Sequence, residues 1–93
     1  MKKWQVGFTK KAAKQVRKLP QGVQKVLRTL VFDMELNGPV RGNWKNYSKL
    51  SPGTHHCHLK SGKPTYVVCW TMISKEIRIL EIYYVGTHEK APY

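Results

Sequence analysis

Three side chains that can move a proton or hold an anion stand at alternate positions of one short segment. They are His56, His58 and Lys60. We expect a β-strand over residues 55–60, in which side chains two positions apart share a face. The other row holds Cys57 and Leu59, which are better core residues. The row of two histidines and one lysine should therefore point to solvent.

Two imidazoles beside an ammonium can cleave a phosphodiester that carries its own nucleophile. The unperturbed pKa of imidazole is about 6.5, so a histidine can deprotonate a ribose 2′-hydroxyl or protonate the leaving 5′-oxygen. A lysine can stabilise the charge that develops on the phosphate. The same residues on an ordinary polar strand would only be solvated. RNA is the substrate that this chemistry suits.

A metal site is the alternative use of these residues. The sequence has four histidines and two cysteines, but it lacks the C-x-x-C or H-x-x-x-H pair that zinc sites usually show. The alternative is a three-histidine site of His56, His58 and His88, which the nearby lysines disfavour because they repel a further cation. We expect neither a metal nor another cofactor.

Cations and aromatic residues alternate around this strand, as single-stranded RNA binding requires. They are Trp44, Lys45, Tyr47, Lys49, Lys60, Lys63 and Tyr66. Trp44 is expected to pack its loop onto the core, whereas Tyr47 could either pack there or stack on a base.

The charge of the chain indicates a polyanionic partner. Seventeen Lys and Arg face five Asp and Glu, a net charge of +12, and such an imbalance fits nucleic acid or an acidic protein. No apolar run approaches the ~20 residues of a membrane span, and residues 1–6 lack the apolar stretch of a signal peptide. Cys57 and Cys69 do not form a disulfide framework. We expect a cytoplasmic protein with no membrane partner.

Two helices should follow a short first strand. Residues 4–8 alternate apolar and polar side chains, and Thr9 can cap a helix over residues 10–19. Pro20 ends that helix and begins the next, which Asn37-Gly38-Pro39 stops. Apolar residues recur along the second helix at helical spacing, namely Val23, Val26, Leu27, Leu30, Val31 and Met34. The short link between the helices predicts an antiparallel hairpin.

Three strands should follow a loop. The loop spans residues 40–54 and mixes turn formers, aromatics and cations. We expect strands at 55–60, 65–73 and 76–85, and a polar tail at 86–93. The order β-α-α-β-β-β predicts a single α+β domain over residues 1–93, with the helical hairpin on one face of a small, mainly antiparallel, twisted sheet.

This order resembles the RelE/ParE toxins of bacterial toxin–antitoxin systems. The stretch WQVGFTKKAAKQVRKLP is similar to the family's first strand and helix, including the Leu-Pro break. NYSKLSPGTHHCHLKSGKPTYVVCWTM resembles its loop, hairpin and central strand. EIRILEIYYVGTHEKAPY resembles its last strand, the Val-Gly step and a tail with a histidine and an aromatic residue. The resemblance covers essentially the whole chain.

The resemblance implies catalytic groups in the loop before the sheet, on the exposed sheet face and in the tail. At matching positions these are Lys49, His56, His58, Lys60, His88 and Tyr93. Many RelE-like proteins also carry an arginine on the central strand, and residues 65–70 contain none. Phosphate binding would then depend on Lys60, Lys63 or Arg78.

The resemblance also implies a function and partners. RelE-like toxins generally cut messenger RNA on the ribosome, and an acidic antitoxin silences them. ParE-like members share the fold, lack the nuclease residues and act on DNA gyrase. The histidine row favours an endoribonuclease that cuts mRNA in the ribosomal A site and is held by an acidic antitoxin. A gyrase inhibitor and a simple RNA-binding module are the alternatives.

Overall fold

The computed structural model describes residues 3–93. Met1 and Lys2, part of the stretch expected to contain no signal peptide, lie outside the described residues. The elements are β1 (Gln5–Phe8), α1 (Lys10–Arg17), α2 (Gln21–Asn37), β2 (Ser48–Ser51), β3 (Thr54–Lys60), β4 (Tyr66–Ser74), β5 (Ile79–Thr87) and the short 3₁₀ helix η1 (His88–Lys90). The predicted α+β class is confirmed.

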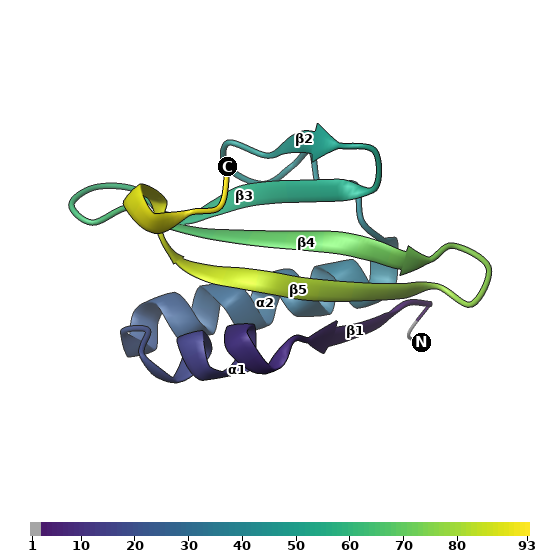
Figure 1. The fold of residues 1–93 in the computed structure, drawn as a ribbon, viewed down its shortest axis with the longest axis horizontal. Coiled ribbons are helices and arrows are strands. Elements are labelled where there is room, and N and C mark those ends of the chain that lie inside the picture. The colour runs from purple at the N-terminus through teal and green to yellow at the C-terminus, as the bar shows by residue number, and fades with distance from the viewer. Residues whose placement is uncertain (1–2) are drawn as a thin grey trace.

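The strands form one five-stranded sheet in the order β1-β5-β4-β3-β2. Neighbours from β2 to β5 pair antiparallel, whereas β1 lies parallel to β5 at one edge. Figure 1 shows both helices on one side of the sheet and the C-terminal end folded back over the other side. The predicted hairpin of helices on one face is therefore present.

The largest differences from the sequence-based boundaries are two. Residues 48–51, expected to be loop, form the edge strand β2, which pairs with β3. The last strand begins at Ile79 and not at Glu76, because residues 75–78 make the turn. Arg78 in that turn has a φ of 56°, a left-handed conformation that ends regular strand pairing.

The helices begin and end where local chemistry requires. The Thr9 hydroxyl accepts a hydrogen bond from the backbone N–H of Ala12 at 3.0 Å, which caps α1. Gly38, with a φ of 90°, ends α2 and donates its N–H to the carbonyl of Met34. The predicted apolar stripe is the buried face of α2, since Val23, Leu27, Leu30 and Met34 are buried there.

The sheet is covered on both faces. The larger core lies between the helices and the sheet and includes Cys57, Leu59, Val68, Trp70, Leu80 and Ile82. A smaller cluster of Val67, Cys69 and Tyr84 lies on the opposite face, against Leu50, Tyr83 and Ala91. Cys57 and Cys69 are free and buried, and burial raises the pKa of each thiol to about 12. Both cysteines therefore act as small core residues.

No helix within residues 3–93 combines the length and apolar character that crossing a membrane requires.

Candidate functional site

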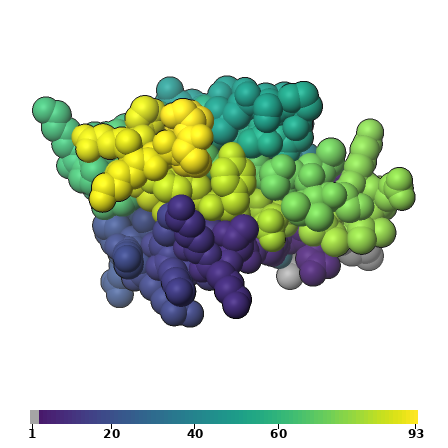
Figure 2. All heavy atoms as spheres, in the orientation of Figure 1, coloured from purple at the N-terminus to yellow at the C-terminus, as the bar shows by residue number. Residues whose placement is uncertain are grey.

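Four aromatic rings meet on the sheet face that lies opposite the helices. The ring centroids of His56 and His58 are 6.1 Å apart, and those of His58 and His88 are 5.7 Å apart. The ring centroid of Tyr93 lies 5.8 Å from that of His88 and 4.6 Å from that of His56, so each ring of the group contacts two others. We call these residues the four-ring cluster. Figure 2 shows the yellow C-terminal residues covering part of this face.

The end of β5 brings the tail to β3. Tyr66 of β4 pairs with Thr87, and the His88 N–H donates to the carbonyl of Thr65 at 2.8 Å. The Tyr84 hydroxyl donates to the Thr87 carbonyl at 2.7 Å. A Cβ on Gly86 would stand only 2.7 Å from that hydroxyl oxygen, so glycine leaves the room that this contact needs. These contacts fix the direction in which η1 leaves the sheet.

His56 is buried, which corrects the expectation that it points to solvent. Only 8% of it is exposed, because the ring of Tyr93 covers it. Its Nδ1 lies 3.1 Å from the Ser48 hydroxyl and 3.4 Å from the Ser48 carbonyl oxygen. A carbonyl only accepts, so the tautomer protonated at Nδ1 suits this contact and leaves the Nε2 lone pair free.

Burial sets the protonation of the two strand histidines. Burial lowers the pKa of His56; the Ser48 carbonyl opposes this shift and the nearby His88 adds to it. The pKa of His58 is lowered by burial first and then by His56, His88 and Lys45. Both imidazoles are therefore neutral at pH 7 and able to accept a proton.

Lys45 belongs to the surroundings of the cluster. Its carbonyl accepts a hydrogen bond from the His58 N–H at 2.8 Å, which continues the edge of the sheet beyond β2. Its charge contributes to the lowered pKa of His58. The predicted cation at this position therefore stands beside one of the predicted imidazoles.

A cleft of about 720 Å³ lies next to the cluster. It is lined by His58, Gly62, Lys63, Pro64, Thr65, Thr87, His88 and Glu89. The turn between β3 and β4 forms one wall, where the Thr65 hydroxyl donates to the Gly62 carbonyl at 2.7 Å. Lys63 is thus a second predicted cation that the fold brings to the histidines.

Lys60 does not continue the row of His56 and His58, which corrects the alternation argument. The pairing of β3 with β4 shifts between His58 and Lys60, so that Lys60 stands opposite Tyr66. Tyr66 packs against the core under the helices, whereas Val67, opposite His58, belongs to the other face. A bulge of this kind breaks the two-residue period of a strand.

Lys49 and Tyr47 are associated with His55 and not with the four-ring cluster. Lys49 pairs with His55 across β2 and β3. His55, only 3% exposed, stacks between Tyr47 and Trp70 at centroid distances of 5.8 and 5.7 Å. The Tyr47 hydroxyl lies 2.7 Å from the His55 Nδ1. Tyr47 packs the loop onto the core beneath the helices.

Arg78 lies at the opposite end of the sheet. It belongs to the β4–β5 turn, and its carbonyl accepts a hydrogen bond from the Gln5 N–H at 2.9 Å. Figure 1 shows this turn and η1 at opposite ends of β5. The fold therefore does not bring Arg78 to the predicted phosphate site.

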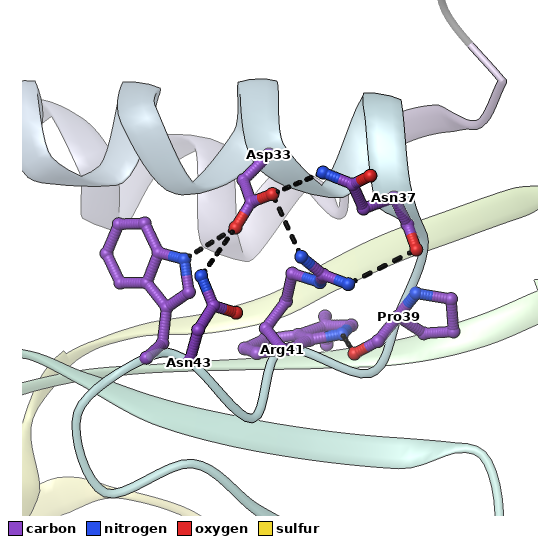
Figure 3. A network of polar contacts seen from close by, with 7 residues as sticks. Asp33, Asn37, Pro39, Arg41 and Asn43 are labelled. Carbon is purple, nitrogen blue, oxygen red and sulfur yellow. Dashed lines mark hydrogen bonds and ion pairs between the residues drawn. The ribbon is translucent and has the colours of Figure 1, made fainter.

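Asp33 organises the loop that precedes β2, a role that the sequence analysis missed. Figure 3 shows its carboxylate facing Asn37, Arg41 and Asn43. Arg41 Nη1 and Trp44 Nε1 donate to it at 2.9 and 2.8 Å, which confirms that Trp44 packs the loop. Burial would raise the pKa of Asp33, but the hydrogen bonds outweigh it and lower the pKa from 3.8 to about 2. The sequence did contain one indication of this role, namely an acid on α2 shortly before a loop that holds an arginine and a tryptophan.

Within residues 3–93, no group of three or more His, Cys, Asp or Glu side chains is arranged to hold a metal ion. The imidazole rings of the cluster meet at steep angles, with centroids 6.1 Å apart for His56 and His58 and 5.7 Å apart for His58 and His88.

No family model matches the sequence, and no curated protein matches it closely enough to compare. Solved structures do match. A double mutant of the E. coli toxin RelE in the free state has a TM-score of 0.73 and 21% identity, covering 98% of this chain and 88% of that one. The isolated E. coli RelE toxin has a TM-score of 0.69 and 18% identity, covering 96% and 88%. The fold is that of RelE.

An archaeal RelE also has this fold. In the RelE–RelB complex from Pyrococcus horikoshii, the matching chain has a TM-score of 0.68 and 13% identity, covering 95% of this chain and 98% of that one. The predicted RelE-like architecture is thereby confirmed. On this RelE fold, the four-ring cluster combines neutral imidazoles with an exposed histidine and two adjacent lysines, a set of groups that can move protons beside an anion.

Proposed function

We propose that this chain is the toxin of a toxin–antitoxin system and that it cleaves messenger RNA without a metal. The observation that carries the proposal is the four-ring cluster, because three imidazoles gather on the side of a RelE fold that lies opposite the helices. The net charge of +12 supports a polyanionic substrate. An acidic antitoxin would then be the natural inhibitor, and mRNA on the ribosome the target in the cytoplasm.

The reaction uses the nucleophile of the RNA itself. Neutral His58 accepts the proton of the 2′-hydroxyl, whose oxygen attacks the adjacent phosphorus. His88 in its protonated form donates a proton to the 5′-oxygen as the P–O5′ bond breaks. The products are a 2′,3′-cyclic phosphate and a free 5′-hydroxyl, so atoms and charge balance without a cofactor.

The remaining groups support this step. Lys45 and Lys63 stabilise the additional negative charge on the phosphate. Tyr93 stacks on a base once the tail admits the RNA, and neutral His56 positions Tyr93 and His58 from beneath. Lys49, Lys60 and Arg78 lie away from the cluster, and they contribute to attracting the RNA backbone.

The test is cleavage of a defined mRNA on programmed ribosomes by the purified protein. We expect the wild type to yield ends with a cyclic or 3′-phosphate and a 5′-hydroxyl, and a 2′-methoxy group at the cut to block the reaction. His58→Ala and His88→Ala should each lower the rate by at least about a hundredfold. Lys75→Ala, which changes an exposed cation in the β4–β5 turn at the other end of the sheet, is the control and should cleave nearly as well as wild type.

Growth provides the second readout. Induction of the wild type should arrest growth and translation, and co-expression of an acidic antitoxin from the neighbouring gene should restore both. A 5′-phosphate product would overturn the mechanism. If a folded His58→Ala/His88→Ala variant stayed fully toxic while inhibiting gyrase, the ParE-like alternative would replace the proposal.

A further inference from the structure

We infer that a second pocket, on the helix side of the junction between β5 and η1, binds a free nucleoside di- or triphosphate. The pocket has a volume of about 410 Å³ and is bounded by α1, the end of β5 and η1. Three lysines and two tyrosines line it, namely Lys11, Lys18, Lys90, Tyr66 and Tyr84. We call it the lysine pocket. Thr87 separates it from the cleft of His58 and His88, because Thr87 lines both cavities.

The pocket lies where the edge of β5 has no neighbouring strand. In the part of the chain that the structure describes, β1 pairs with β5 only over residues 79–82. Beyond them α1 covers the edge, and the Val85 N–H donates to Gln15 Oε1 at 3.0 Å. The His88 N–H bonds across to β4, so the neighbouring Thr87 N–H points the other way, toward the open edge. This edge therefore adds a backbone donor beside the lysines.

Two elements position the three lysines. Lys11, Gln15 and Lys18 follow one another at steps of four and three, so they share one face of α1. At about 1.5 Å per residue, the two lysines are about 10 Å apart along the helix axis. Lys90 comes from η1, which Figure 1 shows at the same end of the sheet as the C-terminal end of α1. The ammonium groups can thus meet one ligand from two sides.

The charges of these lysines are not balanced within the pocket. No acid lines it, and Glu89, next to Lys90 in the sequence, lines the other cleft. Within residues 3–93, none of the three lysines forms an ion pair, and all three are exposed. Like charges around one cavity repel one another, and an anion with several charges relieves that repulsion. A chain of two or three phosphates is such an anion.

The remaining wall suits a ligand that also carries a flat ring. Tyr66 is half-buried, and Leu19 and Tyr84 are buried, so an apolar wall stands beside the cations. Nucleobases stack on aromatic side chains whatever their sequence. A cavity of about 410 Å³ lies within the usual range for small-molecule sites. A nucleoside di- or triphosphate combines the charge and the ring in one molecule of this size.

The first experiment measures binding to the purified full chain by isothermal titration calorimetry, at one salt concentration and without Mg²⁺. The probes are ATP, inorganic triphosphate and adenosine. We expect ATP to bind most tightly, because only ATP uses both the lysines and the apolar wall. Lys18→Gln and Lys90→Gln should each weaken ATP binding about fivefold.

Lys14→Gln is the matched control. Lys14 is exposed on the same helix but does not line the pocket, so this variant loses the same charge. It should weaken ATP binding by less than about twofold. Equal losses in Lys14→Gln and Lys18→Gln would show attraction by overall charge alone and would overturn the inference.

A second readout follows from the two elements that hold the ligand. A nucleotide held by Lys18 and Lys90 connects α1 to η1, so ATP should slow the amide hydrogen exchange of residues 88–90. The effect should be lost in Lys18→Gln, although this substitution lies on another element. Unchanged exchange at saturating ATP would contradict the inferred position of the ligand.

Three further outcomes would overturn the inference. If Lys63→Gln weakens ATP binding and the two pocket variants do not, the nucleotide occupies the histidine cleft. If ATP binds no more tightly than inorganic triphosphate, the tyrosine wall does not receive a base. If Lys18→Gln weakens binding of a short RNA with a 5′-hydroxyl while ATP does not bind, the lysines contact an RNA backbone. None of these measurements depends on cleavage, so they stand apart from the test of the proposed function.

Discussion

The reactivity of each histidine depends on how much water reaches its ring and which charges stand near it. His58 is half-buried and has two imidazoles and the ammonium of Lys45 as neighbours. All of these disfavour a second positive charge, so its pKa lies below the ordinary 6.5. The pKa of His55 is also lowered, by burial first and then by the charge of Lys49. His55 lies under the helices, away from the site.

The pH profile of cleavage tests this account. We expect the rate to fall as the pH drops through the lowered pKa of His58, because protonation removes the base. Lys45→Gln removes a positive neighbour and should raise the pKa of His58. The acidic limb should therefore move to higher pH, whatever happens to the maximal rate.

Lys60→Gln is the matched control for that profile, since the bulge in β3 separates Lys60 from the histidine row. It should leave the acidic limb in place. An identical limb in wild type and Lys45→Gln would show that His58 is not the titrating base.

Asp33 makes stability depend on pH in a different range. Its pKa falls from 3.8 in the unfolded chain to about 2 in the folded one. A depressed folded pKa stabilises the protein above the unfolded value, and the contribution is lost as the pH falls from about 4 to about 2. This lowered pKa contributes about 2 kcal/mol to the free energy of unfolding.

Asp33→Asn should accordingly lower the free energy of unfolding at pH 7 by about 2 kcal/mol or more, because the partly buried Arg41 also loses its partner. Urea unfolding at pH 7 and at pH 3 measures the effect. The difference in free energy of unfolding between wild type and variant should be smaller at pH 3. An equal difference at both pH values would contradict the lowered pKa of Asp33.

At the scale of elements, the junction of β5 and η1 decides where the tail histidine and tyrosine lie. Gly86→Ala places a methyl group 2.7 Å from the hydroxyl of Tyr84, whose ring is only 7% exposed and has little room to move. The hydrogen bond from the Tyr84 hydroxyl to the Thr87 carbonyl should be lost. We expect a loss of about 1–3 kcal/mol in stability and a larger relative loss of cleavage.

A double-mutant cycle can isolate this contact. Tyr84→Phe removes the hydroxyl that meets the new methyl group, so Gly86→Ala should cost less in that background. Gly42→Ala, where a Cβ would meet nothing within 4 Å, is the control. Equal costs of Gly86→Ala in both backgrounds would rule out the hydroxyl as the cause.

The elements could be predicted from the sequence where local patterns determine them. The apolar spacing of α2 and its stop at Gly38 needed no knowledge of tertiary structure. β2 was missed because Ser48–Ser51 has few strand-forming residues and is ordered by pairing with β3. The start of β5 was misplaced because a left-handed Arg78 leaves no clear mark in the sequence.

The site could be predicted only in part, for the same reason. Strand alternation correctly grouped His56 with His58, and the resemblance to RelE-like toxins pointed to His88 and Tyr93. Alternation could not anticipate the bulge that turns Lys60 out of the row, because the bulge arises from pairing with β4. The burial of His56 depends on where the tail lands, which is a contact across 37 positions (93 − 56).

For the whole molecule, the excess of cations predicts how RNA binding responds to salt. If about five cations contact the phosphates of single-stranded RNA, log affinity should fall against log salt concentration with a slope of roughly −3.5. Lys63→Gln should reduce the slope by about 0.7. Fluorescence anisotropy at several salt concentrations measures both, and a flat response would count against the electrostatic contribution.

The parallel pairing of β1 with β5 has a consequence for how the chain folds. Gln5 stands opposite Ile79, 74 positions later (79 − 5), whereas β3, β4 and β5 are joined by short turns. Local hairpins form faster than contacts between distant segments, so β1 should join the sheet after the hairpins. Until it does, β5 exposes an unpaired edge to other chains. Aggregation therefore competes with folding mainly during that late step.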